Sequence, residues 1–397
     1  MKGVLPIVQE AAKSGIRRVV VPGENAMEAA VIPGITVWGV NCLNDLLAAL
    51  NHPELETEKV YQPRIRAEDL LREGTGQDTG DFREVAGQEN AKRGAEIAAA
   101  GFHNLLMIGP PGVGKSMVAG RIPGILPPLT LKESLEVTGI FSVAGLLPPG
   151  QALITRRPFY APHHTVTQAA LIGGGSGIPR PGMVSLAHRG VLFLDELPEF
   201  RKNVLDGMRQ PMEERKVQIA RSAGMVTYPS DFILVAAMNP CPCGYYPDRN
   251  KCRCTQPQIE KYLGKISGPI LDRIDLCVEL HPVDILHLQK TKTEKSSEDM
   301  KRQIRHARER QAERFAGTDC RFNGDIRSAQ VEEYCPLGEE GQKVMEQLYR
   351  TLQLSARVYH RILKTARTIA DLEDREEITG EHLLEAACYR PSETYWN

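Results

Sequence analysis

Short, fully apolar runs alternate with amphipathic and glycine-rich stretches through the middle of the chain. Three of these runs predict strands that are buried on both faces, at residues 104–108, 190–194 and 232–237. Strands of this kind, separated by helical segments, are typical of a parallel sheet that is covered by helices. We therefore expect an α/β core over residues 81–284.

After residue 284 the apolar pattern changes to a helical period. Apolar residues recur at this period at Val358, Ile362, Ala366 and Ile369. Ser355 and Thr379 stand where helix N-caps are expected, since a hydroxyl there accepts a hydrogen bond from a free N–H group of the first turn. We predict an α-helical lid or C-terminal domain over residues 285–397, reached through the polar connector 290–297.

The N-terminal stretch alternates between helical and strand-like patterns. The predicted helices and strands lie at residues 5–14, 18–21, 26–31 and 36–40. Together they form a small α/β piece over residues 1–55, which is too short to be more than marginally stable alone. Residues 56–80 are polar and punctuated by proline and glycine, which favours a linker.

Composition limits the possible classes of protein. A chain of 397 residues fits two or three domains. No apolar stretch approaches the ~20 residues of a membrane helix, and the first residues do not form a secretory signal, so we expect a cytoplasmic protein with no membrane partner. The net charge of -1 gives no global attraction to nucleic acid, and nine cysteines in such a chain favour reduced thiols or a local metal site over disulfides.

A glycine-rich segment follows the first core strand directly. Its residues are Gly109, Pro110, Pro111, Gly112, Val113, Gly114, Lys115 and Ser116. They match the phosphate-loop pattern GxxxxGK[ST] in the strand context that the pattern requires, which disfavours a simple glycine turn. Glycines let backbone N–H groups curl around phosphates, Lys115 would hold the β- and γ-phosphates of ATP, and Ser116 would bind Mg²⁺.

Two further core strands end in polar residues. The run 191–194 is followed by Asp195 and Glu196, which suit a metal-holding carboxylate and a water-activating one. The run 232–238 ends in Asn239, which suits a residue that orients water or touches the γ-phosphate, with a plain turn residue as the alternative. For Asp195 and Glu196 the alternative is a pair of plain surface acids. The phosphate loop upstream favours the functional interpretation.

The order of these motifs resembles that of AAA+ ATPases, and residues 81–88 look like the adenine side of their nucleotide site. Longer segments are similar to the magnesium-chelatase-like ComM/YifB family, at residues 158–165, 173–175, 185–190, 197–200, 238–244, 267–275, 354–357 and 359–362. The resemblance implies a homo-hexameric ring that acts on DNA, single-stranded or branched, and in ComM a helicase that promotes branch migration during natural transformation. It also implies that residues 1–55 are a remnant of a Lon-protease-like N-terminal domain, much of which would be missing.

The same resemblance assigns roles to two arginines. Arg273 would be the finger that a neighbouring subunit supplies to the γ-phosphate, where such a residue is worth ~10³ to 10⁵ in rate. Arg357, in the lid, would be a second sensor that couples nucleotide state to the angle between core and lid. A solvated helix arginine remains the alternative for Arg357.

Four cysteines lie close together in the sequence, at Cys241, Cys243, Cys252 and Cys254. Four thiolates can complete a tetrahedral Zn²⁺ site, although the CxC spacing is tighter than usual. Four reduced structural thiols are the alternative, and the sequence leaves both open.

Candidate DNA contacts lie on a predicted hairpin of two strands, 216–220 and 225–228, around a turn that ends in Gly224. In a ring, Lys216 and Arg221 of every subunit would line a pore that tracks the DNA backbone, with a purely structural hairpin as the alternative. A second basic run comprises Lys301, Arg302, Arg305, Arg308, Arg310 and Arg314. Interleaved acids favour a solvated lid face there, and His163 and His164 are interpreted as part of an insert rather than as metal ligands.

Two other functions remain open. One is a chelatase-type motor that remodels a partner protein, which requires a partner that this chain does not contain. The other is an ATP-dependent protease by analogy with Lon, which requires a catalytic serine and lysine from the N-terminal domain.

Overall fold

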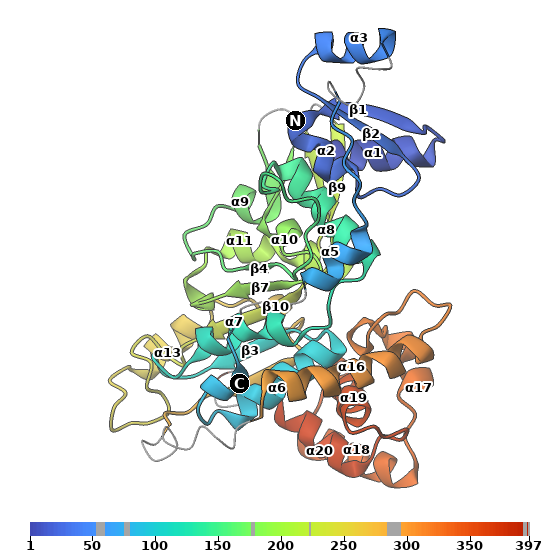
Figure 1. Ribbon diagram of the computed structural model, residues 1–397. Helices are drawn as coiled ribbons and strands as arrows, with labels where there is room; N and C mark the ends of the chain where they lie inside the picture. The colour runs from blue at the N-terminus through green and yellow to red at the C-terminus, as the bar shows by residue number, and fades with distance from the viewer. Residues whose placement is uncertain are drawn as a thin grey trace.

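A five-stranded parallel sheet lies at the centre of the computed structural model (Figure 1). The structure describes residues 1–52, 60–74, 80–175, 179–221, 224–283, 295–391 and 395. The strand order is β11–β3–β10–β7–β4, with bounds Leu276–Glu279, Leu105–Ile108, Ile233–Met238, Val191–Leu194 and Phe159–Tyr160. Every neighbouring pair is parallel, so the carboxyl ends of these strands meet at one edge of the sheet.

Both faces of the sheet are buried, which explains the unbroken apolar runs in the sequence. Along β3, Leu105 and Met107 pack into one apolar cluster, and Leu106 and Ile108 pack into the other. The helices that cover the two faces are α6 (Glu89–Gly101) and α7 (Lys115–Ile125) on one side, and α10 (Met183–Leu186), α11 (Lys202–Gly207) and α13 (Gln256–Leu263) on the other. The predicted α/β core with a parallel sheet is confirmed.

Five α-helices lie in the described part of the C-terminal region, residues 295–391. Their bounds are Ser297–Arg314 (α16), Val331–Tyr334 (α17), Glu339–Thr351 (α18), Ala356–Leu372 (α19) and Gly380–Cys388 (α20). Helices α16 and α19 pack against α6 of the core (Figure 1). The predicted caps are confirmed, because Ser355 accepts a hydrogen bond from the Val358 amide and Thr379 forms a capping box with His382. Most of the predicted connector 290–297 lies outside the described residues.

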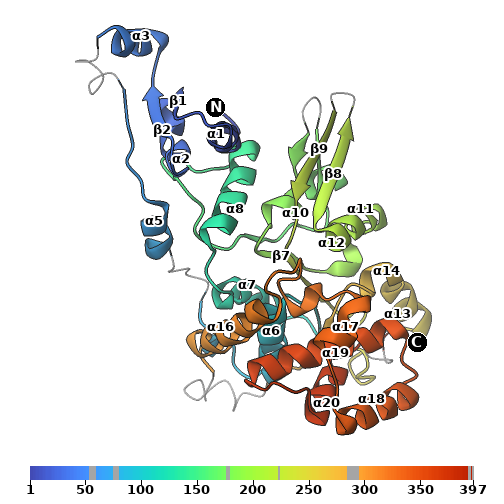
Figure 2. The same ribbon diagram turned by 90° about the vertical axis from the view of Figure 1, so that its right-hand side faces the viewer.

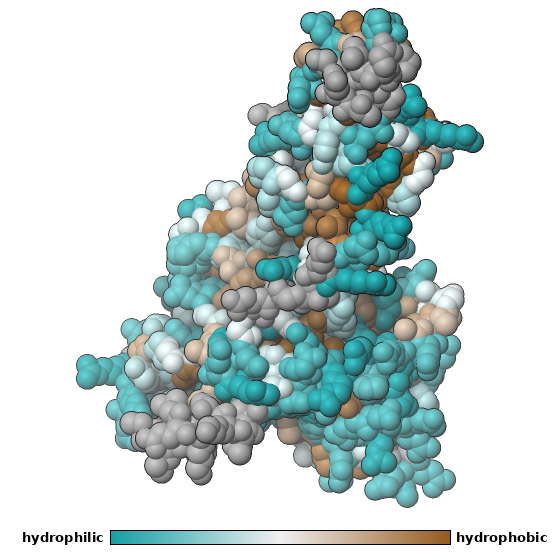
Figure 3. All heavy atoms as spheres, in the orientation of Figure 1, coloured by the Kyte–Doolittle hydropathy of each residue, from teal (hydrophilic) through white to brown (hydrophobic). Residues whose placement is uncertain are grey.

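The N-terminal segment packs against the core through one long helix. Over residues 1–52 the structure describes two parallel strands and three α-helices: α1 (Val4–Lys13), β1 (Arg18–Pro22), α2 (Ala26–Ala29), β2 (Thr36–Val40) and α3 (Leu43–Asn51). Apolar residues of α1 and α8 (Leu131–Ala144) share one cluster, and the Gly3 amide donates to the Ser142 carbonyl at 3.0 Å. Figure 3 shows apolar surface gathered where this segment meets α8.

Part of the segment predicted as a linker, residues 56–80, is helical. Helix α5 (Ala67–Glu73) forms within it because Leu70 and Leu71 pack on the same apolar cluster as α1 and α8. The helical period is not evident in the sequence because the helix has only seven residues, about two turns.

The predicted hairpin is present as β8 (Lys216–Arg221) and β9 (Gly224–Pro229), and it projects away from the sheet (Figure 2). A smaller hairpin, β5 (Gly173–Gly174) with β6 (Arg180–Pro181), contacts β8. The remaining short elements are α9 (Gln168–Ile172), α12 (Arg209–Glu214), α14 (Gly268–Leu271), and the 3₁₀ turns Gly23–Asn25, Phe82–Glu84, Leu197–Glu199, Asn323–Asp325 and Ser328–Gln330. Within the described ranges, no helix combines the length and apolar character that a bilayer crossing needs.

Candidate functional site

The phosphate loop joins the carboxyl end of β3 to the first turn of α7. Gly112 and Gly114 have φ of +80° and +94°, and a Cβ built on either residue meets nothing within 4 Å. Backbone conformation therefore requires glycine at these two positions. At Gly109 the reason is space, because a Cβ would lie 2.6 Å from the Leu280 carbonyl oxygen. These glycines let the backbone N–H groups of the loop turn toward a bound phosphate.

Lys115 is buried inside this loop, with 8% of its surface exposed. Its Nζ donates to the carbonyl oxygens of Gly109 at 2.6 Å and Pro110 at 2.9 Å, and to Asn239 Oδ1 at 3.0 Å. Burial lowers the pKa of Lys115, and the nearby Asp195 carboxylate opposes that shift. The structure thus brings together two residues that are far apart in the sequence, Lys115 and Asn239.

Asp195 lies at the tip of β7, beside the start of α7. Ser116 Oγ donates to Asp195 Oδ2 at 2.9 Å. A hydroxyl and a carboxylate are the oxygen ligands that Mg²⁺ prefers, so these two groups fit a shared magnesium ion. Glu196 follows with φ of 51°, and its amide donates to Asp195 Oδ1 at 2.9 Å. Its carboxylate is exposed at the same edge of the sheet.

His164 is a site residue that the sequence did not reveal. Its Nδ1 lies 3.0 Å from Glu196 Oε2, and its ring lies against that of His163, with centroids 4.1 Å apart. The histidine reaches Glu196 because β4, just before it in the sequence, pairs with β7. That pairing involves two residues of β4, too few for any sequence signal.

The segment 81–88 also reaches the phosphate loop. Gln88 donates through Nε2 to the Val113 carbonyl at 3.3 Å and to the His281 carbonyl at 2.6 Å. Phe82 is fully buried in the core, and its amide donates to Ser297 Oγ at 2.8 Å. These contacts connect the segment to the loop on one side and to the lid helix α16 on the other.

Arg273 and Arg357 lie together at the opposite edge of the sheet. Asn104, which precedes β3, donates to the Arg273 carbonyl at 2.8 Å and to Asp275 at 3.0 Å. The five residue steps from Asn104 through β3 to Gly109 span roughly 17 Å at about 3.3 Å per residue. Arg357 pairs with Asp272, and burial together with the Arg357 and Arg209 guanidinium groups lowers the pKa of Arg273. The structure does not bring either arginine to the phosphate loop of the same chain.

The four predicted cysteine ligands come together. All four Sγ atoms lie within 4.8 Å of one another, directly after β10 and its terminal Asn239. Cys241 and Cys252 are buried, and Cys243 and Cys254 are partly exposed. This grouping fits the donor set of a Zn²⁺ site.

The two basic regions, on β8 and on α16, differ in how far their side chains are exposed. Lys216 and Arg221 are exposed on the projecting strand β8. On α16, in contrast, Arg308 donates to the Ala99 carbonyl at 2.8 Å and Arg314 pairs with the buried Asp371. The prediction of a solvated basic face on α16 is therefore wrong for these two residues, because both guanidinium groups hold the lid helices together and to the core.

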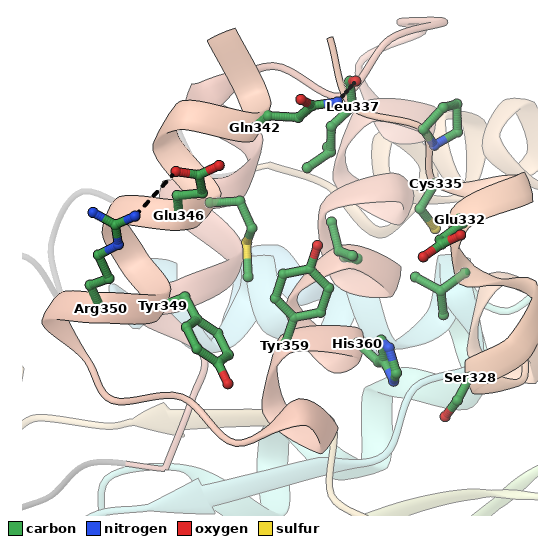
Figure 4. A pocket seen from close by; sticks show the side chains of 14 residues that line it. Ser328, Glu332, Cys335, Leu337, Gln342, Glu346, Tyr349, Arg350, Tyr359 and His360 are labelled. Atoms are coloured by element: carbon green, nitrogen blue, oxygen red, sulfur yellow. Dashed lines mark hydrogen bonds and ion pairs between the residues drawn. The ribbon is translucent and has the colours of Figure 1, made fainter. Parts of the chain in front are cut away.

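A hollow of about 780 Å³ opens in the lid between α17, α18 and α19 (Figure 4). Its walls carry two tyrosines in edge-to-face contact, Tyr349 and Tyr359, with ring centroids 6.1 Å apart. None of its lining residues belongs to the phosphate loop or to the ends of the sheet strands, so the hollow is separate from the candidate site.

Comparisons with known proteins agree with this arrangement. Residues 81–288 match the family described as magnesium chelatase, subunit ChlI, and residues 294–390 match its C-terminal domain. The chain is similar to YifB of Salmonella typhimurium, at 42% identity over 390 residues, which is 98% of this chain and 74% of the relative. It is also similar to the competence protein ComM of Haemophilus influenzae, at 40% identity over 98% of this chain and 74% of the relative. The chain belongs to the ComM/YifB family of magnesium-chelatase-like AAA+ proteins.

Proposed function

We propose that this chain is an ATP-hydrolysing motor that assembles as a homo-hexameric ring and moves along or remodels DNA. The observation that carries the proposal is the meeting of Lys115, Ser116, Asp195 and Asn239 at the carboxyl edge of the sheet. In open parallel sheets, ligands bind at this edge. In this proposal, residues 81–284 are the motor core, 285–397 are the lid, and 1–55 and 56–80 are an N-terminal remnant and its connection.

The residues at this edge of the sheet would bind different parts of ATP·Mg²⁺. Backbone N–H groups of residues 109–116 would hold the phosphates, with Lys115 on the β- and γ-phosphates, and Ser116 and Asp195 would hold Mg²⁺. The metal ion supplies charge neutralisation at the phosphate oxygens when it is bound. Segment 81–88, fixed to the loop through Gln88, would border the adenine.

Hydrolysis requires a base and a positive charge near the γ-phosphate. Glu196 would take a proton from the attacking water, and Asn239 would orient that water. His164, 3.0 Å from the Glu196 carboxylate, would fix the direction in which the carboxylate points, as a positioning residue. His164 lies between β4 and the small hairpin β5–β6 in the sequence. Through His164, the Glu196 carboxylate is therefore in contact with the segment that leads to this hairpin.

The positive charge would come from the next subunit. Arg273 and Arg357 lie together on the edge opposite to the chain's own phosphate loop, and in a head-to-tail ring that edge faces the loop of a neighbour. We propose that both arginines act across this interface. This differs from a lid arginine that senses nucleotide within its own chain, since Arg357 pairs with Asp272 on the far side of the sheet.

DNA would contact the projecting hairpin. Lys216 and Arg221 are exposed on β8, and six copies would line a pore with basic side chains that bind phosphates. The relative named ComM is a competence protein, which is consistent with a role in handling DNA.

The ATPase rate of confirmed hexamers, measured with and without branched DNA, tests the proposal. We expect DNA to stimulate hydrolysis, and Lys115→Ala to abolish it in both conditions. A wild-type ring that hydrolyses ATP at the same rate with and without DNA, and does not bind DNA at low salt, would favour the chelatase-type motor acting on a partner protein.

A further inference from the structure

The spacing of the four cysteine sulfurs is that of a metal site. Cys241 Sγ lies 3.4 Å from Cys243 Sγ and 3.8 Å from Cys252 Sγ, and the sulfurs of Cys243 and Cys252 lie 3.6 Å apart. Four sulfurs around a tetrahedral Zn²⁺ at about 2.3 Å are about 3.8 Å from one another. A disulfide needs a separation of about 2.05 Å. Three sulfur separations are therefore close to the value for a tetrahedral site, and the sulfur of Cys254 lies within 4.8 Å of the other three.

We propose that Cys241, Cys243, Cys252 and Cys254 bind one Zn²⁺, and that this site holds residues 241–254, the cysteine loop, against the phosphate loop. The proposal of a zinc site does not depend on the proposed function. The proposal that this site supports nucleotide binding does depend on it.

The cysteine loop contains no helix or strand, yet its backbone is well organised. The Gly244 amide donates to the Cys241 carbonyl at 3.0 Å, and the Cys252 amide donates to the Asp248 carbonyl at 2.8 Å. The Tyr246 amide points to Cys241 Sγ at 3.5 Å, as N–H groups around metal-bound thiolates do. Two tight turns thus bring the two CxC pairs face to face. The buried side of the loop packs on an apolar cluster of the core, and a metal ion would connect the two CxC pairs to each other.

The charge of the loop suits bound zinc. Four thiolates and one Zn²⁺ leave a formal charge of about -2, and binding releases the thiol protons to solvent. Three basic residues lie between or beside the ligands in the sequence, at Arg249, Lys251 and Arg253. Lys251 also pairs with Asp248 in the same loop, and Arg249 donates to the Cys254 carbonyl at 3.3 Å, so at least one of these cations lies beside a ligand residue.

The cysteine loop touches the phosphate loop directly. Gly244 has φ of +88°, and a Cβ built on it would lie 2.6 Å from Pro111 Cδ. Asn239, which accepts a hydrogen bond from Lys115 Nζ at 3.0 Å, stands two positions before Cys241. A rigid cysteine loop therefore supports the nucleotide site at two places, Pro111 and Asn239.

Zinc content of the full chain, purified without a histidine tag, is the first test. We expect about one zinc per chain and, after exchange with Co²⁺, the intense visible absorption of tetrahedral cobalt thiolate. A mercurial reagent that modifies thiols should release the zinc from the wild-type protein. This test does not depend on whether a cysteine variant folds. Metal-free protein that takes up neither Zn²⁺ nor Co²⁺ under reducing conditions would overturn the site.

Paired variants locate the metal. The double variant Cys243→Ser and Cys254→Ser should lose the zinc, because serine is a poor ligand. The matched control, Cys42→Ser and Cys388→Ser, removes two exposed thiols elsewhere and should keep it. Zinc retained at full stoichiometry in the first double variant would overturn the assignment.

Support of the phosphate loop is tested separately with Gly244→Ala. We expect this variant to keep its zinc and to bind a fluorescent ATP analogue on the order of tenfold more weakly, because the added methyl group pushes Pro111. The control Gly338→Ala, whose Cβ meets nothing within 4 Å, should bind as the wild type does. An unchanged affinity of Gly244→Ala for the ATP analogue would contradict the claim that the cysteine loop supports the phosphate loop. If the wild type itself binds no nucleotide, the proposed function fails, while the zinc measurement still decides the metal site.

Discussion

Glu196 has a left-handed backbone, with φ of 51°, although it is not a glycine. Non-glycine residues hold this conformation at a cost of about 1–3 kcal/mol, and they cluster at functional sites. Here the turn directs the carboxylate beyond the tip of β7, where it meets His164, and the preceding Asp195 meets Ser116. The turn therefore points the two carboxylates in different directions, which suits the proposed roles of Asp195 as a magnesium ligand and of Glu196 as the base for water.

Glu196→Gln should bind ATP normally and hydrolyse it about 10² to 10⁴-fold more slowly, because the amide cannot accept a proton from water. Equilibrium binding and steady-state turnover measure the two effects. The control is Glu199→Gln, which removes a nearby carboxylate paired with Lys265 and should leave turnover unchanged. Normal turnover in Glu196→Gln contradicts its assignment.

His164→Ala should lower kcat about tenfold, with KM for ATP unchanged, because the Glu196 carboxylate loses the group that orients it. His164→Gln, which can restore a hydrogen bond, should recover part of the loss. His163→Ala is the control, since His163 hydrogen-bonds to Thr165 and reaches Glu196 only through its ring contact with His164. A change in KM alone, or equal effects of the two alanine variants, would assign His164 a structural role.

The phosphate loop, Asp195, Glu196 and Asn239 could be predicted from the sequence because each directly follows an unbroken apolar strand. His164 could not, because its position depends on the short β4 pairing with β7. The neighbourhood of Arg273 and Arg357 was equally hidden, since it depends on how the lid packs against residues before β11. Local patterns identify strand ends, whereas contacts between segments depend on the complete fold.

The hairpin β8–β9 is the element that best separates its exposed and buried faces. Val217 and Ile219 are buried in the core cluster, while Lys216, Gln218 and Arg221 are exposed. This alternation made the hairpin predictable. Helix α5 was missed because one short apolar patch decides its packing, and α16 was misjudged because its basic residues were treated as one face although Arg308 and Arg314 point inward.

The double variant Lys216→Ala and Arg221→Ala should weaken DNA binding without a change in zinc or ATP binding. If both side chains contact phosphates, the slope of log K against log salt should fall by about one per residue. The control Lys301→Ala and Arg302→Ala removes two basic residues of α16 that pair with Glu298 and Asp299. Equal losses from both pairs would show that only net charge matters, against a hairpin contact.

At the scale of the whole molecule, the sheet has two unlike ends. One carries the phosphate loop and the acidic pair, and the other carries Arg273 and Arg357. In the proposed head-to-tail ring, each complete site would contain residues of two subunits. The proposal therefore predicts that one chain alone hydrolyses ATP poorly.

Mixed rings test this central claim most directly. Lys115→Ala subunits keep their arginines, and Arg273→Ala subunits keep their phosphate loops, so rings of either variant alone should hydrolyse ATP poorly. In an equal mixture, roughly a quarter of the interfaces combine an intact loop with an intact arginine, because each position is correct half the time. We expect ATPase activity to return at about that fraction of the wild-type rate. A mixture that assembles into rings and stays as inactive as its components would contradict a site shared between subunits.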